Sequence, residues 1–284
     1  MAIRQLTVRG REYLKLGTRL LQRYRQETPT GGIWDAADLN WWWRRKRSTD
    51  DLGQLFWMEG DEPIAGVLQT DWGTEWQCDP ISLPSQGLDL RQEVWEQALE
   101  ATSSAHGLAV SVRTDDFWAL DFLAQASLVD GGGGSTTMWM AAEDCPPATT
   151  LPTGYRLTDR TETGDRPHHL IKRNEVDVEL RLGQTPLYDP ELDLLILNDD
   201  GEVVGYAMFW NDVVTGIGMV EPMRTEEGHE RKGLAGHLLR SGFDRLVERG
   251  ARRLKIGYES PVAGSVYRRA GFVEDSTVVI FRRI

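Results

Sequence analysis

Cysteine is scarce in this chain of 284 residues, which contains only Cys78 and Cys145. Two cysteines predict neither a disulfide framework nor a zinc site, and we expect both to be ordinary small residues. No stretch is apolar over the roughly 20 residues that a membrane helix needs. The N-terminus, Met-Ala-Ile-Arg-Gln-Leu, has no apolar signal core. The sequence therefore predicts a cytoplasmic protein in a reducing compartment that does not associate with a membrane.

Lysine is also rare, since Lys15, Lys46, Lys172, Lys232 and Lys255 are the only ones. Arginine supplies most of the positive charge, which is typical of a GC-rich bacterial genome. The formal net charge of −12 disfavours binding to nucleic acids or to anionic membranes. The same charge is compatible with a cationic amine as substrate.

Two common phosphate-binding motifs are missing, because no G-x-G-x-x-G follows an early strand and no G-K-[ST] occurs. A different pattern is present. An extended apolar run, residues 217–220, leads into the basic loop Arg231-Lys232-Gly233-Leu234-Ala235-Gly236, and an amphipathic helix ending near Gly250 follows. The N–H groups and the dipole at a helix start both favour an anion. The pattern predicts a pyrophosphate site.

A second motif follows this loop at a fixed distance. Residues 253–258 are expected to form a strand, residues 260–269 a short helix and residues 277–281 a final strand. The two motifs read Glu230-Arg231-Lys232-Gly233-Leu234-Ala235 and Ser260-x-x-Ala263-x-x-x-Tyr267-x-x-x-Gly271-Phe272. Together they resemble the GNAT superfamily of acetyl-CoA-dependent N-acetyltransferases, whose patterns are Arg/Gln-x-x-Gly-x-Gly/Ala and Asn-x-x-Ala-x-x-x-Tyr-x-x-x-Gly-Phe. Glu230 and Ser260 depart from these patterns.

The resemblance covers residues 154–284 and implies an α/β fold, a mixed twisted sheet flanked by helices. It also implies acetyl-CoA as co-substrate, bound in a cleft where two central strands splay apart. The strand end that would pair with the pantetheine arm and bind the thioester oxygen is Met223, Arg224 and Thr225. The residues that would bind the pyrophosphate are Arg231, Lys232, Gly233, Leu234, Ala235 and Gly236.

The two halves of the chain share a plan, which suggests a duplicated domain. The matching segments, in the same order, are residues 61–66 and 200–205, the helices ending before Gly107 and at Gly250, residues 108–112 and 254–258, and residues 126–130 and 270–274. We therefore predict two tandem GNAT-like domains, 1–150 and 154–284, joined by a linker rich in Pro and Thr. Four consecutive glycines, residues 131–134, read as a flexible hairpin tip.

The first of these domains is expected to be degenerate and not catalytic. No Arg or Lys lies in residues 84–89, before its helix, so a pyrophosphate would lack its counter-charge there. Leu123 stands at the position that corresponds to Tyr267.

The resemblance implies a general acid at Tyr267, because a phenol is mostly protonated at neutral pH and can protonate a thiolate. Glu221, at the end of the strand before the loop, is the candidate general base, acting directly or through water. A solvent-facing carboxylate is the alternative for Glu221. Weaker candidates for the base are Glu226, Glu227 and Glu259.

The histidines are not expected to form a site. We interpret His229 as a loop residue and His237 as part of the exposed face of its helix. His168 and His169 form a pair without spaced carboxylates, which is not a metal site, so no metal is expected.

Two regions leave alternatives open. Residues 163–190 would help to form the acceptor site, where Glu175, Asp177 and Glu179 could bind a cationic amine or form a solvated helix face. Residues 41–43 are three consecutive tryptophans, which could line a substrate or partner surface or could be buried, and burial is the favoured interpretation.

The sequence thus predicts an N-acetyltransferase that transfers an acetyl group to a small-molecule amine by direct attack, as a monomer or homodimer. The alternative is a non-catalytic acyl-CoA-binding or interaction module.

Overall fold

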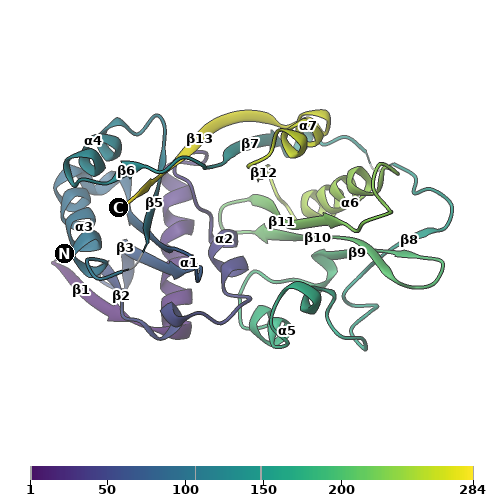
Figure 1. The fold of residues 1–284 in the computed structure, drawn as a ribbon, viewed down its shortest axis with the longest axis horizontal. Helices are drawn as coiled ribbons and strands as arrows, with labels where there is room; N and C mark the ends of the chain where they lie inside the picture. Colours follow the sequence, from purple (N-terminus) through teal and green to yellow (C-terminus); the bar gives the residue numbers. More distant parts are fainter. Residues whose placement is uncertain (1, 106, 148, 284) are drawn as a thin grey trace. The chain divides into compact units, whose positions relative to one another are not determined.

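The computed structural model describes residues 2–105, 107–147 and 149–283, and it divides into two compact units (Figure 1). The first unit contains residues 1–39, 46–135 and 276–284, and the second contains residues 40–45 and 136–275. Met1, His106, Ala148 and Ile284, which fall within the predicted domains and their linker, lie outside the described residues.

The first unit is built on a mixed sheet with the strand order β1-β2-β3-β4-β5-β13. Neighbouring strands of this sheet are antiparallel, with the exception of β4 and β5, which are parallel. Its strands are β1 (Ile3–Val8), β2 (Gln54–Glu59), β3 (Glu62–Asp71), β4 (Trp76–Ser82), β5 (Leu108–Arg113), β6 (Val129–Asp130), which pairs with β13, and most of β13 (Val273–Arg282). Its helices are α1 (Gly10–Glu27), the start of α2 (Ala36–Trp42), α3 (Gly87–Ala101) and α4 (Phe117–Gln125), with short 3-10 turns at η1 (Ser48–Asp51) and η2 (Pro84–Gln86).

The second unit repeats this plan with the strand order β8-β9-β10-β11-β12-β7. Only β11 and β12 are parallel to each other. Its strands are β8 (Tyr155–Asp159), β9 (Asp193–Asn198), β10 (Val203–Asp212), β11 (Ile217–Thr225), β12 (Arg253–Tyr258) and β7 (Thr136–Ala141). Its helices are α5 (Val178–Leu182), α6 (Leu234–Glu248) and α7 (Pro261–Arg269), and its 3-10 turns are η3 (Ala142–Asp144), η4 (His169–Arg173) and η5 (Pro190–Leu192).

The last strand of each sheet comes from the other half of the sequence. β7 precedes the predicted linker but pairs with β12 along the whole of that strand, and the C-terminal part of β13 pairs with β5. Five strands in sequence order followed by an exchanged sixth therefore describe both units, which confirms the predicted tandem fold. The units differ from the predicted division at residue 150 in three segments, 40–45, 136–150 and 276–284.

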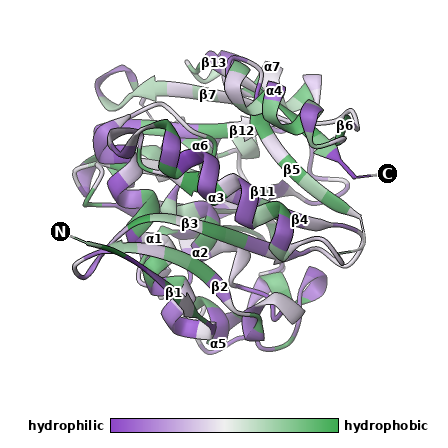
Figure 2. Ribbon diagram, turned by 90° about the vertical axis from the view of Figure 1, so that its left-hand side faces the viewer, coloured by the Kyte–Doolittle hydropathy of each residue, from purple (hydrophilic) through white to green (hydrophobic). Residues whose placement is uncertain are grey.

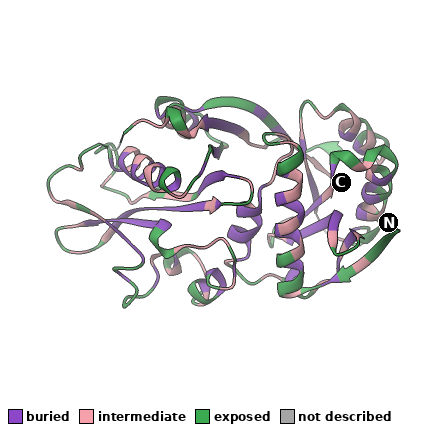
Figure 3. Cartoon of the chain, turned by 180° about the vertical axis from the view of Figure 1, so that it is seen from behind, coloured by how far each residue is buried: buried purple, intermediate pink, exposed green. Residues whose placement is uncertain are grey.

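Apolar patterning explains why the central strands and α6 form a core. Residues 204–210 of β10 are all buried, as expected for a strand covered on both faces. The stripe predicted on α6 packs against this strand through Leu238, Leu239, Phe243 and Leu246. Gly250, at φ +85°, ends the helix as predicted. Figure 2 shows hydrophobic residues along the corresponding central strand β3, and Figure 3 shows helices that are buried on one side and exposed on the other.

The three consecutive tryptophans belong to the second unit and are buried, which confirms the favoured interpretation. The Trp43 indole donates to Gln184 Oε1 at 3.0 Å, and the Arg181 guanidinium lies 4.0 Å from the centre of the Trp43 ring. The aromatic run therefore helps to anchor residues 181–184 within this unit and does not form an exposed partner surface.

The structure also bears on the lack of long apolar stretches and on the scarcity of cysteine. In the part of the chain that is described, no helix combines the length and the apolar character needed to cross a membrane. Cys78 is buried, Cys145 is half-buried, and both are free thiols.

The prediction of a hairpin tip at the four glycines is wrong. β6 and β7, on either side of them, pair in different units, and the glycines run beside β13. The Gly131 N–H donates to the Ile280 carbonyl at 2.8 Å. At Gly134, where φ is +118°, an added Cβ would lie 1.9 Å from the Val278 carbonyl oxygen. Glycine is required here because the backbone of β13 occupies the place of a side chain.

We expect Gly134→Ala to destabilise the protein by at least about 2 kcal/mol, because the backbone would have to move and the residue is strained at positive φ. Gly132→Ala is the matched control, since φ is +65° there but nothing lies within 4 Å of an added Cβ. Urea unfolding of both variants checks this expectation. Equal losses in the two variants would mean that the contact with β13 contributes nothing.

Candidate active site

The parallel strands β11 and β12 separate after a short contact. They pair at Ile217, Gly218 and Met219, opposite residues 253–255, and the ladder extends no further. Beyond Met219, β11 remains bonded to β10, with an irregularity at residues 221–222 before pairing resumes at Met223. The backbone of Met223, Arg224 and Thr225 therefore lies beyond the point where β11 and β12 stop pairing. This is the strand end where the resemblance would place the pantetheine arm.

The predicted pyrophosphate loop leads directly into the N-terminus of α6. Gly233 is the N-cap at φ +81°, and no side chain caps the helix. The first hydrogen bond across this turn runs from the His237 N–H to the Gly233 carbonyl at 3.0 Å, so the N–H groups before it are available to an anion. Added Cβ atoms at Gly233 and Gly236 would meet nothing within 4 Å, which leaves open space in front of the turn.

The charged residues of the loop are exposed, but only one of them has a side-chain partner. Lys232 Nζ donates to the Tyr155 hydroxyl at 3.0 Å, and that hydroxyl lies 3.0 Å from His229 Nδ1. Arg231 has φ +59°, an uncommon value for a residue with a side chain. His229 is a loop residue, as predicted. The contact of Tyr155 with Lys232 and His229 was not predicted, because Tyr155 lies at the start of an apolar strand distant in the sequence.

The sequence predicted His237 on the exposed face of α6, and this prediction is wrong because the residue is buried. Its Nδ1 bonds to the Thr149 carbonyl, and its Nε2 lies 3.3 Å from Ser241 Oγ. The segment before β8, which contains Thr149, covers the ring. The helical periodicity of the sequence could not predict this contact, because Thr149 is distant in the chain.

Tyr267 and Glu221 are brought close enough to interact electrostatically. Burial, and to a lesser extent the charge of Glu221, raises the pKa of the Tyr267 phenol to about 12. The phenol is therefore fully protonated at neutral pH, as a proton donor requires. Glu221 is exposed on β11, and its carbonyl accepts the Trp210 indole N–H at 2.7 Å.

Three of the acidic candidates, Glu226, Glu175 and Glu179, are bound in ion pairs. Glu226 accepts two hydrogen bonds from Arg173, at 2.8 and 2.7 Å. Burial acts to raise the pKa of Glu226, but the bonds and the charge of Arg173 outweigh it and lower the pKa. Glu175 lies 3.3 Å from Arg45, and Glu179 lies 2.8 Å from Arg160. Glu175 and Glu179 are therefore already neutralised locally.

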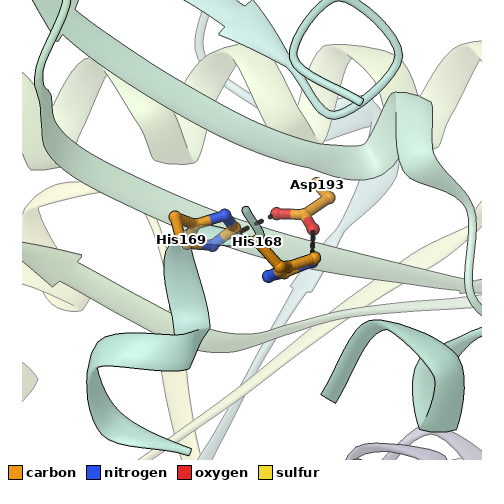
Figure 4. A group of neighbouring side chains, drawn as sticks. All are labelled: His168, His169 and Asp193. Atoms are coloured by element: carbon orange, nitrogen blue, oxygen red, sulfur yellow. Dashed lines mark ion pairs between the residues drawn. The ribbon is translucent and has the colours of Figure 1, made fainter. Parts of the chain in front are cut away.

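A buried cluster of His168, His169 and Asp193 lies on the face of β10 opposite α6 (Figure 4). Gly205 and Phe209 contact α6, so the alternation of the strand turns Tyr206 and Trp210 to the other face. There the His169 ring stacks on Tyr206 with centroids 4.7 Å apart.

The sequence interpretation that the histidine pair has no carboxylate partner is wrong. Asp193 Oδ2 lies 3.0 Å from His168 Nε2, and Oδ1 lies 3.5 Å from His169 Nε2. The Tyr188 hydroxyl also donates to Asp193, at 3.1 Å. The one available signal was a carboxylate directly before the apolar run 194–197.

These three residues supply the only set of metal-type donors in the described ranges, but their geometry fits a metal poorly. His168 Nδ1 accepts the Leu170 N–H at 3.2 Å. A neutral ring with Nδ1 as acceptor carries its proton on Nε2, the nitrogen that faces Asp193, so that nitrogen has no lone pair for a metal. The absence of a metal stays a prediction, and the geometry describes a buried imidazole–carboxylate contact.

Residues 155–272 match the model of the acetyltransferase (GNAT) family, so the chain contains a GNAT acetyltransferase domain in its second half. A search of curated proteins found no match.

Solved structures of similar fold cover both units. A tandem GNAT protein from the clavulanic acid biosynthesis pathway has a TM-score of 0.68 at 12% identity, covering 99% of this chain and 98% of that one. A GCN5-related N-acetyltransferase from Sphaerobacter thermophilus has a TM-score of 0.63 at 18% identity, with 99% and 95% covered. A GNAT-family acetyltransferase from Colwellia psychrerythraea has a TM-score of 0.63 at 12% identity, with 99% and 100% covered. At these identities the likeness establishes the tandem fold and not a substrate.

We expect the His169 ring to make the fold sensitive to acid. Burial, together with the nearby His168 and Arg160 and against the charge of Asp193, lowers its pKa from 6.5 to about 4. Between pH 6.5 and 4 the His169 ring is therefore protonated in the unfolded chain but not in the folded chain. The free energy of unfolding falls as the pH decreases through this range. At about 1.4 kcal/mol per pKa unit, this loss is about 3 kcal/mol.

His169→Phe should remove that part of the acid sensitivity, and urea unfolding at pH 8, 6.5, 5 and 4 would measure it. His229→Phe, a change at a half-buried loop histidine, is the control that should keep the parent's pH profile. Identical profiles for the parent and His169→Phe would show that the ring is not held neutral by burial.

Proposed function

We propose that the second unit transfers an acetyl group from acetyl-CoA to the amine of a small molecule. The observation that carries this proposal is the divergence of β11 and β12 together with the uncapped N-terminus of α6, the helix that follows β11 in the chain. An open strand edge and a set of free N–H groups are what an extended thioester with a pyrophosphate would use. The GNAT domain at residues 155–272 supports the same class of reaction.

The pyrophosphate would bind at the start of α6. The dipole there is equivalent to roughly half a positive charge. N–H groups of residues 233–236 would donate to the phosphate oxygens, and Arg231 and Lys232 would supply charge. Lys232 would have to exchange its bond to Tyr155 for one to phosphate, which costs little because the contact is exposed.

The pantetheine arm would lie along the free edge of β11 at residues 223–225, and a backbone N–H there would stabilise the thioester oxygen as it becomes negative. The amine nitrogen attacks the carbonyl carbon, and the carbon–sulfur bond breaks. Glu221, directly or through water, takes a proton from the amine, and Tyr267 gives one to the leaving sulfur. The net result is an amide and a free thiol, with one proton moved from nitrogen to sulfur.

A second candidate is a module that binds acyl-CoA without turnover. Glu230 places a negative charge in the loop where the family pattern has Arg or Gln, and this observation favours it. The protonated Tyr267 beside Glu221 favours catalysis, since a binding module would need neither.

We further propose that the protein works in the cytoplasm of a bacterium, as a monomer or homodimer, without nucleic acid. The support is the net charge of −12 together with the few cysteines.

Gly233→Asp is expected to weaken acetyl-CoA binding at least tenfold, because it places bulk and negative charge beside the pyrophosphate. Gly250→Asp is the matched control, since it makes the same change at positive φ in open space beyond the other end of α6. Calorimetric titration of both folded variants measures the effect. Unchanged affinity in Gly233→Asp would place the coenzyme elsewhere.

Tyr267→Phe is expected to lower kcat by about a hundredfold or more, with little change in acetyl-CoA affinity, because it removes only the proton donor. Tyr258→Phe is the control, since this half-buried tyrosine donates to Glu274 at 2.6 Å and has no proposed role. Release of free thiol with an amine library as acceptor provides the assay. Equal turnover by the parent and Tyr267→Phe at every pH would exclude Tyr267 as the acid. If the parent binds acetyl-CoA but turns over no amine, the non-catalytic acyl-CoA-binding module would be favoured.

A further inference from the structure

The first unit contains a cavity of about 520 Å³ that the proposed reaction does not use. β4 and β5 pair only at Trp76 and Gln77, opposite Leu108 and Ala109, and the cavity opens beyond that point. Its walls come from α1, the chain at residues 32–34, β4, the first turns of α3, and β5. Its volume lies within the usual range for small-molecule sites, about 300–1,000 Å³.

The charges around this cavity do not suit a phosphate. No Arg or Lys occurs between Leu83 and Leu90, where β4 passes into α3. The two arginines in the wall already have partners. Arg113 pairs with Asp115 through two bonds of 2.9 and 2.8 Å, and Arg91 pairs with Asp116. A phosphorylated ligand would find no free cation.

Asp79 is the one carboxylate of the wall with no cation beside it. Its side chain is buried, and it accepts the Trp34 indole N–H at 2.7 Å and the Gln77 amide at 2.6 Å. No Lys, Arg or His of the described chain lies within ion-pair distance of it. Two neutral donors do not compensate a buried negative charge, which normally requires an ion pair. Tyr24, Trp34 and Trp95 supply aromatic rings to the same cavity.

We propose that this cavity binds a small organic cation, an amine with an apolar or aromatic body, whose ammonium group pairs with Asp79. The rings would cover the apolar body and stabilise the positive charge through their faces. The ammonium group would supply the positive charge that no side chain of the described residues supplies to Asp79. This inference does not rest on the proposed acetyl transfer, because it concerns another unit and another cleft.

The proposal has a definite pH dependence. Burial, and more weakly the charge of Asp38, raises the pKa of Asp79 to about 7. Pairing with a cation requires the ionised carboxylate, so binding should release a proton at neutral pH. Affinity should rise about tenfold per pH unit below 7 and level off above it.

The other groups around Asp79 do not give this dependence. Burial raises the pKa values of Tyr13 and Cys78 far above neutral, so both stay uncharged. Arg91 and Arg113 also line the cavity, each in an ion pair with an aspartate, and Asp38 acts on Asp79 through its charge.

Calorimetry of the full chain with 2-phenylethylamine tests the proposal, with 2-phenylethanol as a neutral ligand of the same shape. We expect the amine to bind with one site in the first unit, at least tenfold more tightly than the alcohol. The pH profile should be as described, and buffers of different ionisation enthalpy should reveal about half a proton released at pH 7. These measurements need no variant.

Asp79→Asn should lower the amine affinity at least tenfold and abolish proton release. Asp89→Asn, which removes an exposed carboxylate from the first turn of α3, should change neither. Equal binding of amine and alcohol, or amine binding that survives Asp79→Asn with its pH profile intact, would overturn the proposal. A second equivalent of acetyl-CoA that competes with the amine would also overturn it, whereas acetyl-CoA failing to bind at all would contradict only the proposed acetyl transfer.

Discussion

The short parallel contact between β11 and β12 is the constraint on which the second unit depends. The two strands pair over three positions and then part, so each needs a second partner to remain in the sheet. β11 keeps β10, and β12 pairs along its full length with the exchanged strand β7. Without β7, β12 would become an edge strand with one side unpaired for much of its length. The exchange of strands thus stabilises the opening in the sheet, and β13 has the same role beside β5 in the first unit.

The same opening leads to different chemistry in the two units because the connection that follows it differs. In the second unit the chain from Thr225 to Leu234 is long enough to carry Arg231 and Lys232 to the helix start. In the first unit only a 3-10 turn separates β4 from α3, and it brings no cation. That cleft is instead lined by aromatic rings and by Asp79. A duplicated framework has kept its backbone geometry while the charges of its clefts have diverged.

Local patterns in the sequence predicted the parts of this structure that local interactions determine. The basic loop, the amphipathic helix α6 and its end at Gly250 all depend on residues close together in the chain. The exchange of β7 and β13 was not predictable, because a strand's own pattern shows that it pairs but not with which partner. The glycines at 131–134 were misread for the same reason, since the feature that requires them is the distant backbone at Val278. Asp193 was missed because only the fold brings it to His168 and His169.

The two buried carboxylates, Asp193 and Asp79, show why burial alone does not define a binding site. Asp193 has two imidazole rings within 3.5 Å, and an imidazole is a group that can become a cation. Asp193 also accepts a hydrogen bond from the Tyr188 hydroxyl. Asp79 is bonded only to an indole and an amide, neither of which can become a cation. Asp79 also borders a cavity. Asp193 is thus surrounded by imidazole and phenol groups of the protein, whereas Asp79 obtains its counter-charge from a positively charged ligand.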